Sequence, residues 1–192
     1  KKNLTKKQIA LLAYKIEKQN LKESTGLQDQ IYATYGGFSK IIYNKKNFKV
    51  SKITNDPKIQ KNLENNLILF YTYKSRVAHT IEKKKFSNIK NKLKNLNEMK
   101  LMAFESVKLI KKKETDKVGK MLDRFWRNKK KLSPNVSNET IDKYYSIAIK
   151  NGALGGKLIG AGGGGFLLIY AKKKYHKKII KNLSNLTPVK FN

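Results

Sequence analysis

The chain has 192 residues and no cysteine, so disulfides, thiolate zinc sites and cysteine nucleophiles are excluded. No apolar run approaches the roughly 18 residues that a membrane span needs, and no signal peptide is visible, so we expect a cytoplasmic protein without a membrane partner. The formal net charge of +31 would suit a polyanionic partner.

The positive charge consists almost entirely of lysine, and the only arginines are Arg76, Arg124 and Arg127. Side chains that read bases and phosphates are more often arginine, because its planar fork binds bidentately. The lysines are scattered along the chain together with asparagine, isoleucine and tyrosine, which all have A/T-rich codons. We therefore attribute the charge to a low-GC genome, and a basic nucleic-acid-binding module is the alternative.

The first part of the chain predicts a helix and a pair of strands. Thr5 and Gln8 form a capping box, and the inner face of the helix is expected to carry Ile9, Leu12, Ala13 and Ile16. Residues 38–43 and 48–53 have the composition of strands joined by a turn. Asn55-Asp56-Pro57 then interrupts the pattern and marks the expected boundary between domains 1–54 and 55–192.

The second part predicts alternating strands and helices. A buried strand at 67–71 is followed by helical periodicity over 86–110 and 118–125, and a third helix begins at Ser137 as its N-cap. A strand at 166–171, a helix at 173–183 and a final short strand complete the series. The alternation indicates an α+β fold with a sheet covered by helices on one side.

Asp29 is the first candidate for chemistry, because acidic residues are scarce, 13 in the whole chain. It lies in the uncharged stretch 26–30, which is soon followed by Gly36-Gly37. A carboxylate in such a place can accept or orient the proton of a substrate hydroxyl. An N-cap or turn aspartate is the alternative.

Eight of the twelve glycines lie between residues 152 and 165, directly before an apolar strand. Glycine costs conformational entropy, so this density indicates positive φ angles or close backbone contacts. The run has no Walker pattern and does not open a helix, which disfavours a direct phosphate cradle. We expect a rigid turn that packs beneath a phosphate site supplied elsewhere, and a tight turn without a ligand is the alternative.

Thr72 and Arg76 follow the strand at 67–71. The end of a strand is a common place for substrate contacts, and an arginine there can hold an anionic group bidentately. An exposed helix start is the alternative.

Taken together, these segments resemble the GHMP kinases, a family of small-molecule kinases. Residues 26–38 are similar to its G-x-Q-D-Q…GGF segment, and residues 69–78 to its L-[FY]-[FY]-T-G-x-x-R-x-A segment, with Tyr73 where glycine is usual. Residues 126–142 are similar to its W-x-x-K-x-x-L-S…S-N-x-x-I-D stretch. Residues 152–166 match its third motif nearly residue for residue, in the form specific to the heptose and fucose kinase branch.

The resemblance implies transfer of a phosphoryl group from ATP, with Mg²⁺, to the anomeric hydroxyl of D-glycero-D-manno-heptose 7-phosphate, giving the 1,7-bisphosphate. A fucokinase-like enzyme is the alternative within the family. Asp29 would be the catalytic residue, and Thr72 and Arg76 would bind substrate. The nucleotide side of the site would be bordered by Gly160, Gly162, Gly163, Gly164 and Gly165, and no residue is assigned as a metal ligand.

The resemblance also implies a two-domain fold. Residues 1–54 would be the end of the N-terminal domain, and residues 55–192 most of a C-terminal ferredoxin-like α+β domain. The family's phosphate-binding motif, P-x-x-x-G-L-G-S-S, does not occur in the chain. We therefore expect most of the ATP site to lie upstream, and the chain to be an inactive fragment when it is alone.

Overall fold

The computed structural model describes residues 3–23, 26–44, 47–73, 89–160 and 162–190. The chain divides into two compact units, Lys1–Asn55 and Asp56–Asn192. The division lies one residue after the boundary expected from Asn55-Asp56-Pro57.

The first unit combines helices with a two-stranded antiparallel sheet. Its elements are α1 (Lys6–Lys15), a π-helical turn (Ile16–Asn20), α2 (Gln28–Tyr35), β1 (Ser39–Tyr43) and β2 (Phe48–Lys52). The predicted capping box is confirmed: the Thr5 side chain accepts a hydrogen bond from the Gln8 amide, and the Gln8 side chain accepts one from the Thr5 amide at 2.8 Å. This pair fixes where α1 begins.

The core of the first unit is small, and it corrects the predicted face of α1. Ala10, Ile31 and Phe48 are buried together. The predicted inward residues Ile9 and Ile16 are each 44% exposed. The small side chain of Ala10 lets α1 pack closely against α2, so the helix turns that side inward and leaves its larger apolar residues outside.

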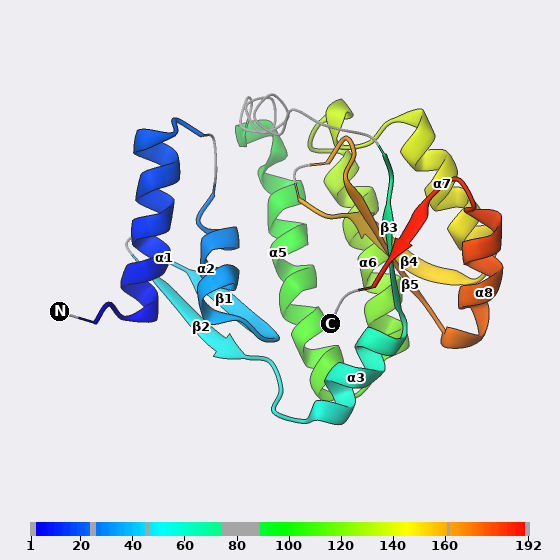
Figure 1. Cartoon of the computed structure of the whole chain (residues 1–192), viewed down its shortest axis with the longest axis horizontal. Coiled ribbons are helices and arrows are strands. Elements are labelled where there is room, and N and C mark those ends of the chain that lie inside the picture. The colour runs from blue at the N-terminus through cyan, green and yellow to red at the C-terminus, as the bar shows by residue number, and fades with distance from the viewer. Residues whose placement is uncertain (1–2, 24–25, 45–46, 74–88, 161, 191–192) are drawn as a thin grey trace. The chain divides into compact units, whose positions relative to one another are not determined.

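The second unit holds a four-stranded antiparallel sheet in the order β4-β5-β3-β6. Along the chain its elements are α3 (Pro57–Asn65), β3 (Leu67–Tyr71), α5 (Ile89–Lys111), α6 (Thr115–Lys130), a 3₁₀ turn (Pro134–Val136), α7 (Glu139–Lys150), β4 (Ala153–Leu158), β5 (Phe166–Ala171), α8 (Lys173–Asn182) and β6 (Thr187–Val189). A β-α-β-β-α-β series with this strand order is ferredoxin-like. The predicted α+β fold class is confirmed (Figure 1).

Helices cover both faces of this sheet, so the prediction of a cover on one side is wrong. Neighbouring residues of a strand point to opposite faces. Ile169 of β5 belongs to the core shared with α7 and α8, whereas Tyr170 lies against Gly119 of α6. Figure 1 shows the strands between α6 on one side and α7 and α8 on the other. The unbroken apolar run of β5 is the sequence signature of burial on both faces.

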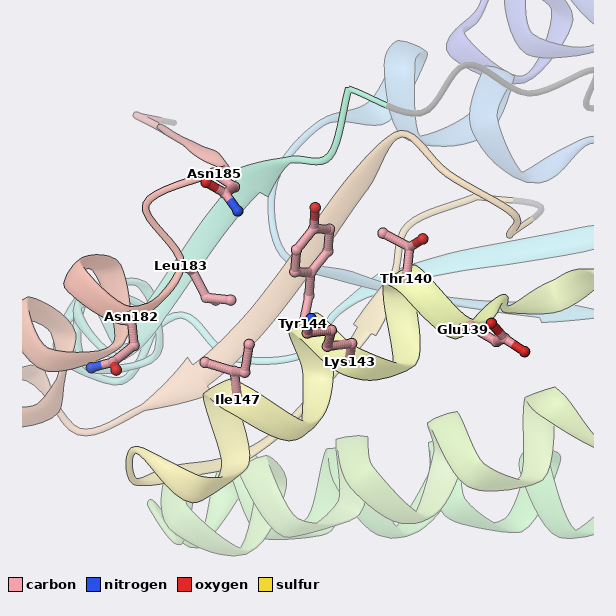
Figure 2. Close-up of a pocket in the computed structure, with 8 residues that line it drawn as sticks. All are labelled: Glu139, Thr140, Lys143, Tyr144, Ile147, Asn182, Leu183 and Asn185. Carbon is pink, nitrogen blue, oxygen red and sulfur yellow. The ribbon is translucent and has the colours of Figure 1, made fainter.

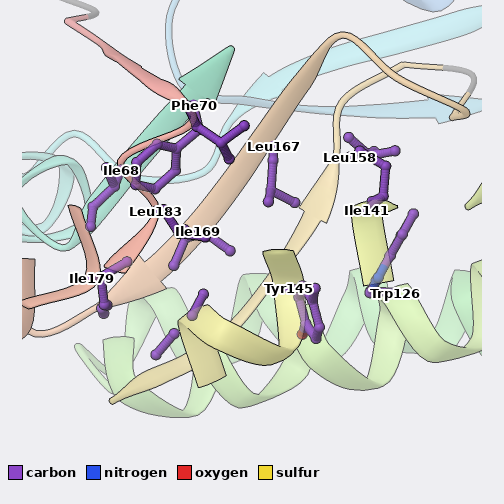
Figure 3. Close-up of a cluster of buried hydrophobic side chains, with 14 of the residues drawn as sticks. Ile68, Phe70, Trp126, Ile141, Tyr145, Leu158, Leu167, Ile169, Ile179 and Leu183 are labelled. Carbon is purple, nitrogen blue, oxygen red and sulfur yellow. The ribbon is translucent and has the colours of Figure 1, made fainter. Parts of the chain in front are cut away.

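The main core lies between the sheet, α7 and α8, with the end of α6 closing it (Figure 3). Phe70 and Trp126 are its largest fully buried side chains. Burial of each such side chain stabilises the fold by roughly 1.5–3 kcal/mol. This core supports the strand ends and the helix end from which the candidate site is built.

Three local features differ from expectation. The Asp56-Pro57 pair that was interpreted as a break is also the start of α3, where the Asp56 carboxylate accepts a hydrogen bond from the Lys58 amide at 2.9 Å. Strand β4 includes glycines that had been assigned to a turn. The N-cap of α7 is Asn138 rather than Ser137, whose hydroxyl donates instead to Asp142.

Candidate functional site

The glycine loop, Gly160 with Gly162–Gly165, lies between the antiparallel strands β4 and β5 of a β-hairpin. Within it, φ is +75° at Gly160, +112° at Gly162, +77° at Gly163 and +90° at Gly165. Side chains strongly disfavour these angles, whereas glycine adopts them readily. The expected positive φ angles are therefore the physical reason for this run of glycines.

Thr72, just beyond β3, holds the far end of the glycine loop. Its backbone N–H and its hydroxyl both donate to the carbonyl oxygen of Gly165, at 2.9 and 2.8 Å. The Thr72 side chain is only 2% exposed. Two predicted site residues from segments 93 positions apart are thus brought into direct contact.

The middle of the loop is held by the segment that precedes α7. The Gly163 amide donates to the Val136 carbonyl at 3.0 Å, and the Asn138 side-chain amide donates to the Gly163 carbonyl at 3.1 Å. A Cβ at Gly162 would lie 2.5 Å from the Val136 oxygen, so the backbones touch there. Much of the hydrogen bonding of the loop is therefore directed into its own domain, which agrees better with a packed rigid turn than with a direct phosphate cradle.

The start of the loop is held by Lys129, near the end of α6. Its ammonium donates to the Gly160 carbonyl at 2.6 Å. Reasoning from the sequence did not assign Lys129 or Asn138 to the site. The signal that could have found them was their place in the W-x-x-K…S-N stretch, since both lie in segments that resemble family motifs.

Asp29 lies in the first turn of α2 with its side chain exposed. Leu27 is the N-cap residue of that helix, so Asp29 does not cap it. Burial raises the pKa of Tyr43 on β1, with Tyr32 and then the Asp29 carboxylate adding to the effect. The next residue, Gln30, is buried and hydrogen-bonds Glu17, which anchors α2 in the first unit. The fold thus presents Asp29 on a fixed helix.

Arg76, the other residue expected to bind substrate, lies outside the described residues.

Aromatic rings flank Thr72 at the end of the sheet. The Tyr71 ring lies 4.8 Å from that of Tyr73 and 5.3 Å from that of Phe166, measured between centroids. Tyr73, which replaces the family's usual glycine, has φ +53° and is 61% exposed. Its hydroxyl shares a hydrogen bond with Thr187 of β6. The left-handed backbone at this position explains why glycine is usual there.

A separate cavity of about 340 Å³ opens beside α7 (Figure 2). Its walls come from α7 and from the end of α8 with the turn beyond it, and include Tyr144, Ile147, Leu183 and Asn185. None of the predicted site residues that the structure describes lines it. We therefore place the candidate site at the glycine loop and not in this cavity.

Two further observations concern the part of the chain that the structure describes. It contains no group of three or more histidine, cysteine, aspartate or glutamate side chains placed to hold a metal. None of its helices combines the length and the apolar character that crossing a membrane would require.

Comparison with known proteins identifies the family. Residues 106–186 match the model of the GHMP kinases C-terminal domain. The chain is 34% identical over 180 residues to a D-glycero-alpha-D-manno-heptose 7-phosphate kinase of Campylobacter jejuni. The aligned region covers 92% of the chain and 53% of that relative. The chain belongs to the GHMP kinase family. The resemblance found in the sequence is thereby confirmed.

Other GHMP kinases give a consistent comparison. A bifunctional fucokinase/GDP-fucose pyrophosphorylase of Arabidopsis thaliana is 30% identical over 154 residues, covering 77% of the chain and 14% of that protein. A mevalonate kinase crystal structure matches with a TM-score of 0.74 at 26% identity, covering 98% of the chain and 57% of that structure. The chain therefore spans about half the length of the Campylobacter relative.

Proposed function

We propose that this chain carries the C-terminal domain of an ATP-dependent sugar kinase that phosphorylates the anomeric hydroxyl of D-glycero-D-manno-heptose 7-phosphate. The observation that carries the proposal is the glycine loop, with its positive φ angles and its attachment to α6, α7 and β3. The family match includes that loop, and the similarity to the Campylobacter heptose 7-phosphate kinase supports the substrate.

Asp29 has the properties of the residue that receives or orients the proton. Its exposed carboxylate is available to a sugar hydroxyl, and the buried neighbours Gln30 and Ile31 hold its helix in place. As the anomeric oxygen bonds to the γ-phosphorus of ATP, the bond from that phosphorus to the ADP oxygen would break and ADP would leave, while the hydroxyl proton would pass to the Asp29 carboxylate. Positioning and charge stabilisation supply most of the remaining rate enhancement in such reactions.

ATP, when bound, supplies the phosphoryl group, and Mg²⁺ neutralises charge on its phosphates. In kinases Mg²⁺ is commonly held by one or two carboxylates together with the phosphates themselves, and no residue of this chain is assigned as its ligand. Gly160 and Gly162–Gly165 would form the rigid floor beside the nucleotide and substrate. Because Thr72 is buried, we infer that it acts on substrate through Gly165 rather than by direct contact.

The test uses the product of the complete open reading frame that encodes this chain. With ATP and Mg²⁺ we expect ADP release and a new anomeric phosphate on heptose 7-phosphate, detected by ³¹P NMR. L-Fucose, galactose and mevalonate serve as competitors, and we expect kcat/KM for the heptose to exceed theirs by about 100-fold, because a site that hydrogen-bonds a substrate group rejects analogues that lack it. A preference for fucose would favour the fucokinase-like alternative, in line with the Arabidopsis relative.

The net charge of +31 motivates a test of the alternative function, nucleic-acid binding. A basic nucleic-acid-binding module would bind DNA with an affinity that falls steeply and independently of sequence as salt rises. We expect no such binding at physiological salt.

The cytoplasm is the location that we propose for the kinase.

A further inference from the structure

Lys129 occupies an unusual position for a lysine. It is 8% exposed at the end of α6, and its ammonium lies 5.9 Å from the centroid of the fully buried Trp126 ring. Burying an ammonium group is costly unless strong partners compensate for the lost water. An apolar side chain such as methionine would fill similar space without that cost, so packing alone does not explain this lysine.

The partner of the ammonium indicates what it does. Lys129 donates to the carbonyl oxygen of Gly160, the first residue of the glycine loop, at 2.6 Å. A hydrogen bond with a charged donor is roughly twice as strong as a neutral one. Hydrogen bonds from Asn138 and Thr72 hold the middle and the end of the loop, at Gly163 and Gly165. The Lys129 ammonium acts at the start of the loop, on Gly160.

We propose that Lys129 is a positioning residue, whose ammonium fixes the Gly160 peptide and with it the conformation of the glycine loop. Its effect on catalysis rests on the proposed kinase function, in which the loop forms the floor of the site. A displacement of about 1 Å in such a surface can lower the rate of a positioned reaction about 100-fold. The hold on the loop itself is a property of this chain and can be measured without substrate.

The first experiment measures amide hydrogen exchange in the chain. Lys129→Met should raise the exchange rate of the Gly163 amide, which donates to Val136, by about tenfold or more, because local opening becomes easier. Amides in α8 should exchange at unchanged rates. Lys131→Met is the matched control, since it removes the same charge from an exposed site two residues away. Unchanged exchange at Gly163 in Lys129→Met would overturn the proposal.

A second variant separates the hydrogen bond from the volume of the side chain. Lys129→Arg keeps a charged donor near the Gly160 carbonyl and should leave exchange at Gly163 within about threefold of wild type. If both variants loosen the loop equally, the bond is not what holds it and the proposal is wrong. If Lys129→Met does not fold, the arginine variant decides by itself, and a tenfold rise in its exchange contradicts the proposal.

The second experiment is kinetic and uses the product of the complete open reading frame. Lys129→Met should lower kcat at least about tenfold while KM for sugar and ATP stays within about threefold, the pattern of a group that acts in the transition state. A looser loop with unchanged kcat would refute the role in catalysis. If the wild type phosphorylates no sugar, the proposed function fails, whereas the exchange measurement still decides whether Lys129 fixes the loop.

Discussion

Gly36 in the first unit and Gly155 in the second are needed for different reasons. Gly36 ends α2 with φ +65° and ψ −175°, and a Cβ added there meets nothing within 4 Å among the described atoms. Gly155 has no such unusual φ, but its Cβ would lie 2.1 Å from the Gly119 carbonyl and 2.7 Å from the Asp123 amide of α6. Gly162 combines both conditions. Glycine thus serves backbone rotation at Gly36, close packing at Gly155 and both at Gly162.

The largest effect is expected where a glycine only provides space. Gly155→Ala should destabilise the second unit by about 3 kcal/mol or more, because β4 and α6 must separate to admit the methyl group. Urea unfolding followed through the single tryptophan, Trp126, reports on this unit. Gly26→Ala, in the first unit, is the control: a Cβ there meets nothing within 4 Å, and the unfolding transition reported by Trp126 should not shift. An equally small loss for Gly155→Ala would show that the backbones can part without cost.

Gly162→Ala should come next, with a loss of about 2–3 kcal/mol. The substitution forces φ of +112° on a residue with a side chain and brings its Cβ to 2.5 Å from the Val136 oxygen. The backbone of a loop can shift more readily than a strand packed on a helix, so the cost should stay below that of Gly155→Ala. The same tryptophan signal measures it, and a larger loss than for Gly155→Ala would reverse the comparison.

Gly36→Ala tests the cost of backbone rotation without a clash. Its φ and ψ lie in a region that is nearly exclusive to glycine, so we expect a loss of about 1–2 kcal/mol in the first unit. Hydrogen exchange of the α2 amides reports on that unit directly. A loss as large as that of Gly155→Ala would mean that space matters at Gly36 too.

Tyr73→Gly should have the smallest effect. Glycine adopts the left-handed backbone without the cost of about 1–2 kcal/mol that a tyrosine incurs there. The substitution also removes the ring contact with Tyr71, which stabilises the fold by about 0.5–1.5 kcal/mol. These terms nearly cancel, so the stability of the second unit should change by less than about 1 kcal/mol in denaturant unfolding. A clear gain in stability would show that the aromatic contacts add little.

Much of the second unit could be predicted from its sequence, because its elements are long and strongly periodic. Helices α5 to α8 show apolar residues at three- and four-residue spacing, and β5 is an unbroken apolar run. Helix α3 was missed because its capping residues, Asp56 and Pro57, also mark a break in the chain. Strand β4 was missed because Gly155 and Gly156 have low strand propensity, and their close packing on α6 and β5 is a tertiary effect.

The glycine loop and Thr72 of the candidate site could be predicted from the sequence, whereas Lys129 was not predicted. Glycine density indicated the positive φ angles of the loop, and the end of a strand indicated Thr72. Composition does not separate Lys129 from the rest of the 44 lysines and arginines, and only its place in the W-x-x-K…S-N stretch distinguishes it, because its burial depends on how α6 meets the loop. The exposed apolar residues of α1 were predicted as a core face, because periodicity shows that a helix has two faces but not which one finds a partner.

The substitution Asp29→Asn tests most directly whether Asp29 is the catalytic residue of a sugar kinase. In the product of the complete reading frame, the nearly isosteric change should lower kcat for heptose 7-phosphate at least about 100-fold, with KM values little changed. Asp116→Asn, at a half-buried aspartate paired with Lys172, is the matched control and should stay within about threefold of wild type. If Asp29→Asn also keeps kcat within about threefold, Asp29 is a structural residue of α2 and the catalytic assignment is contradicted.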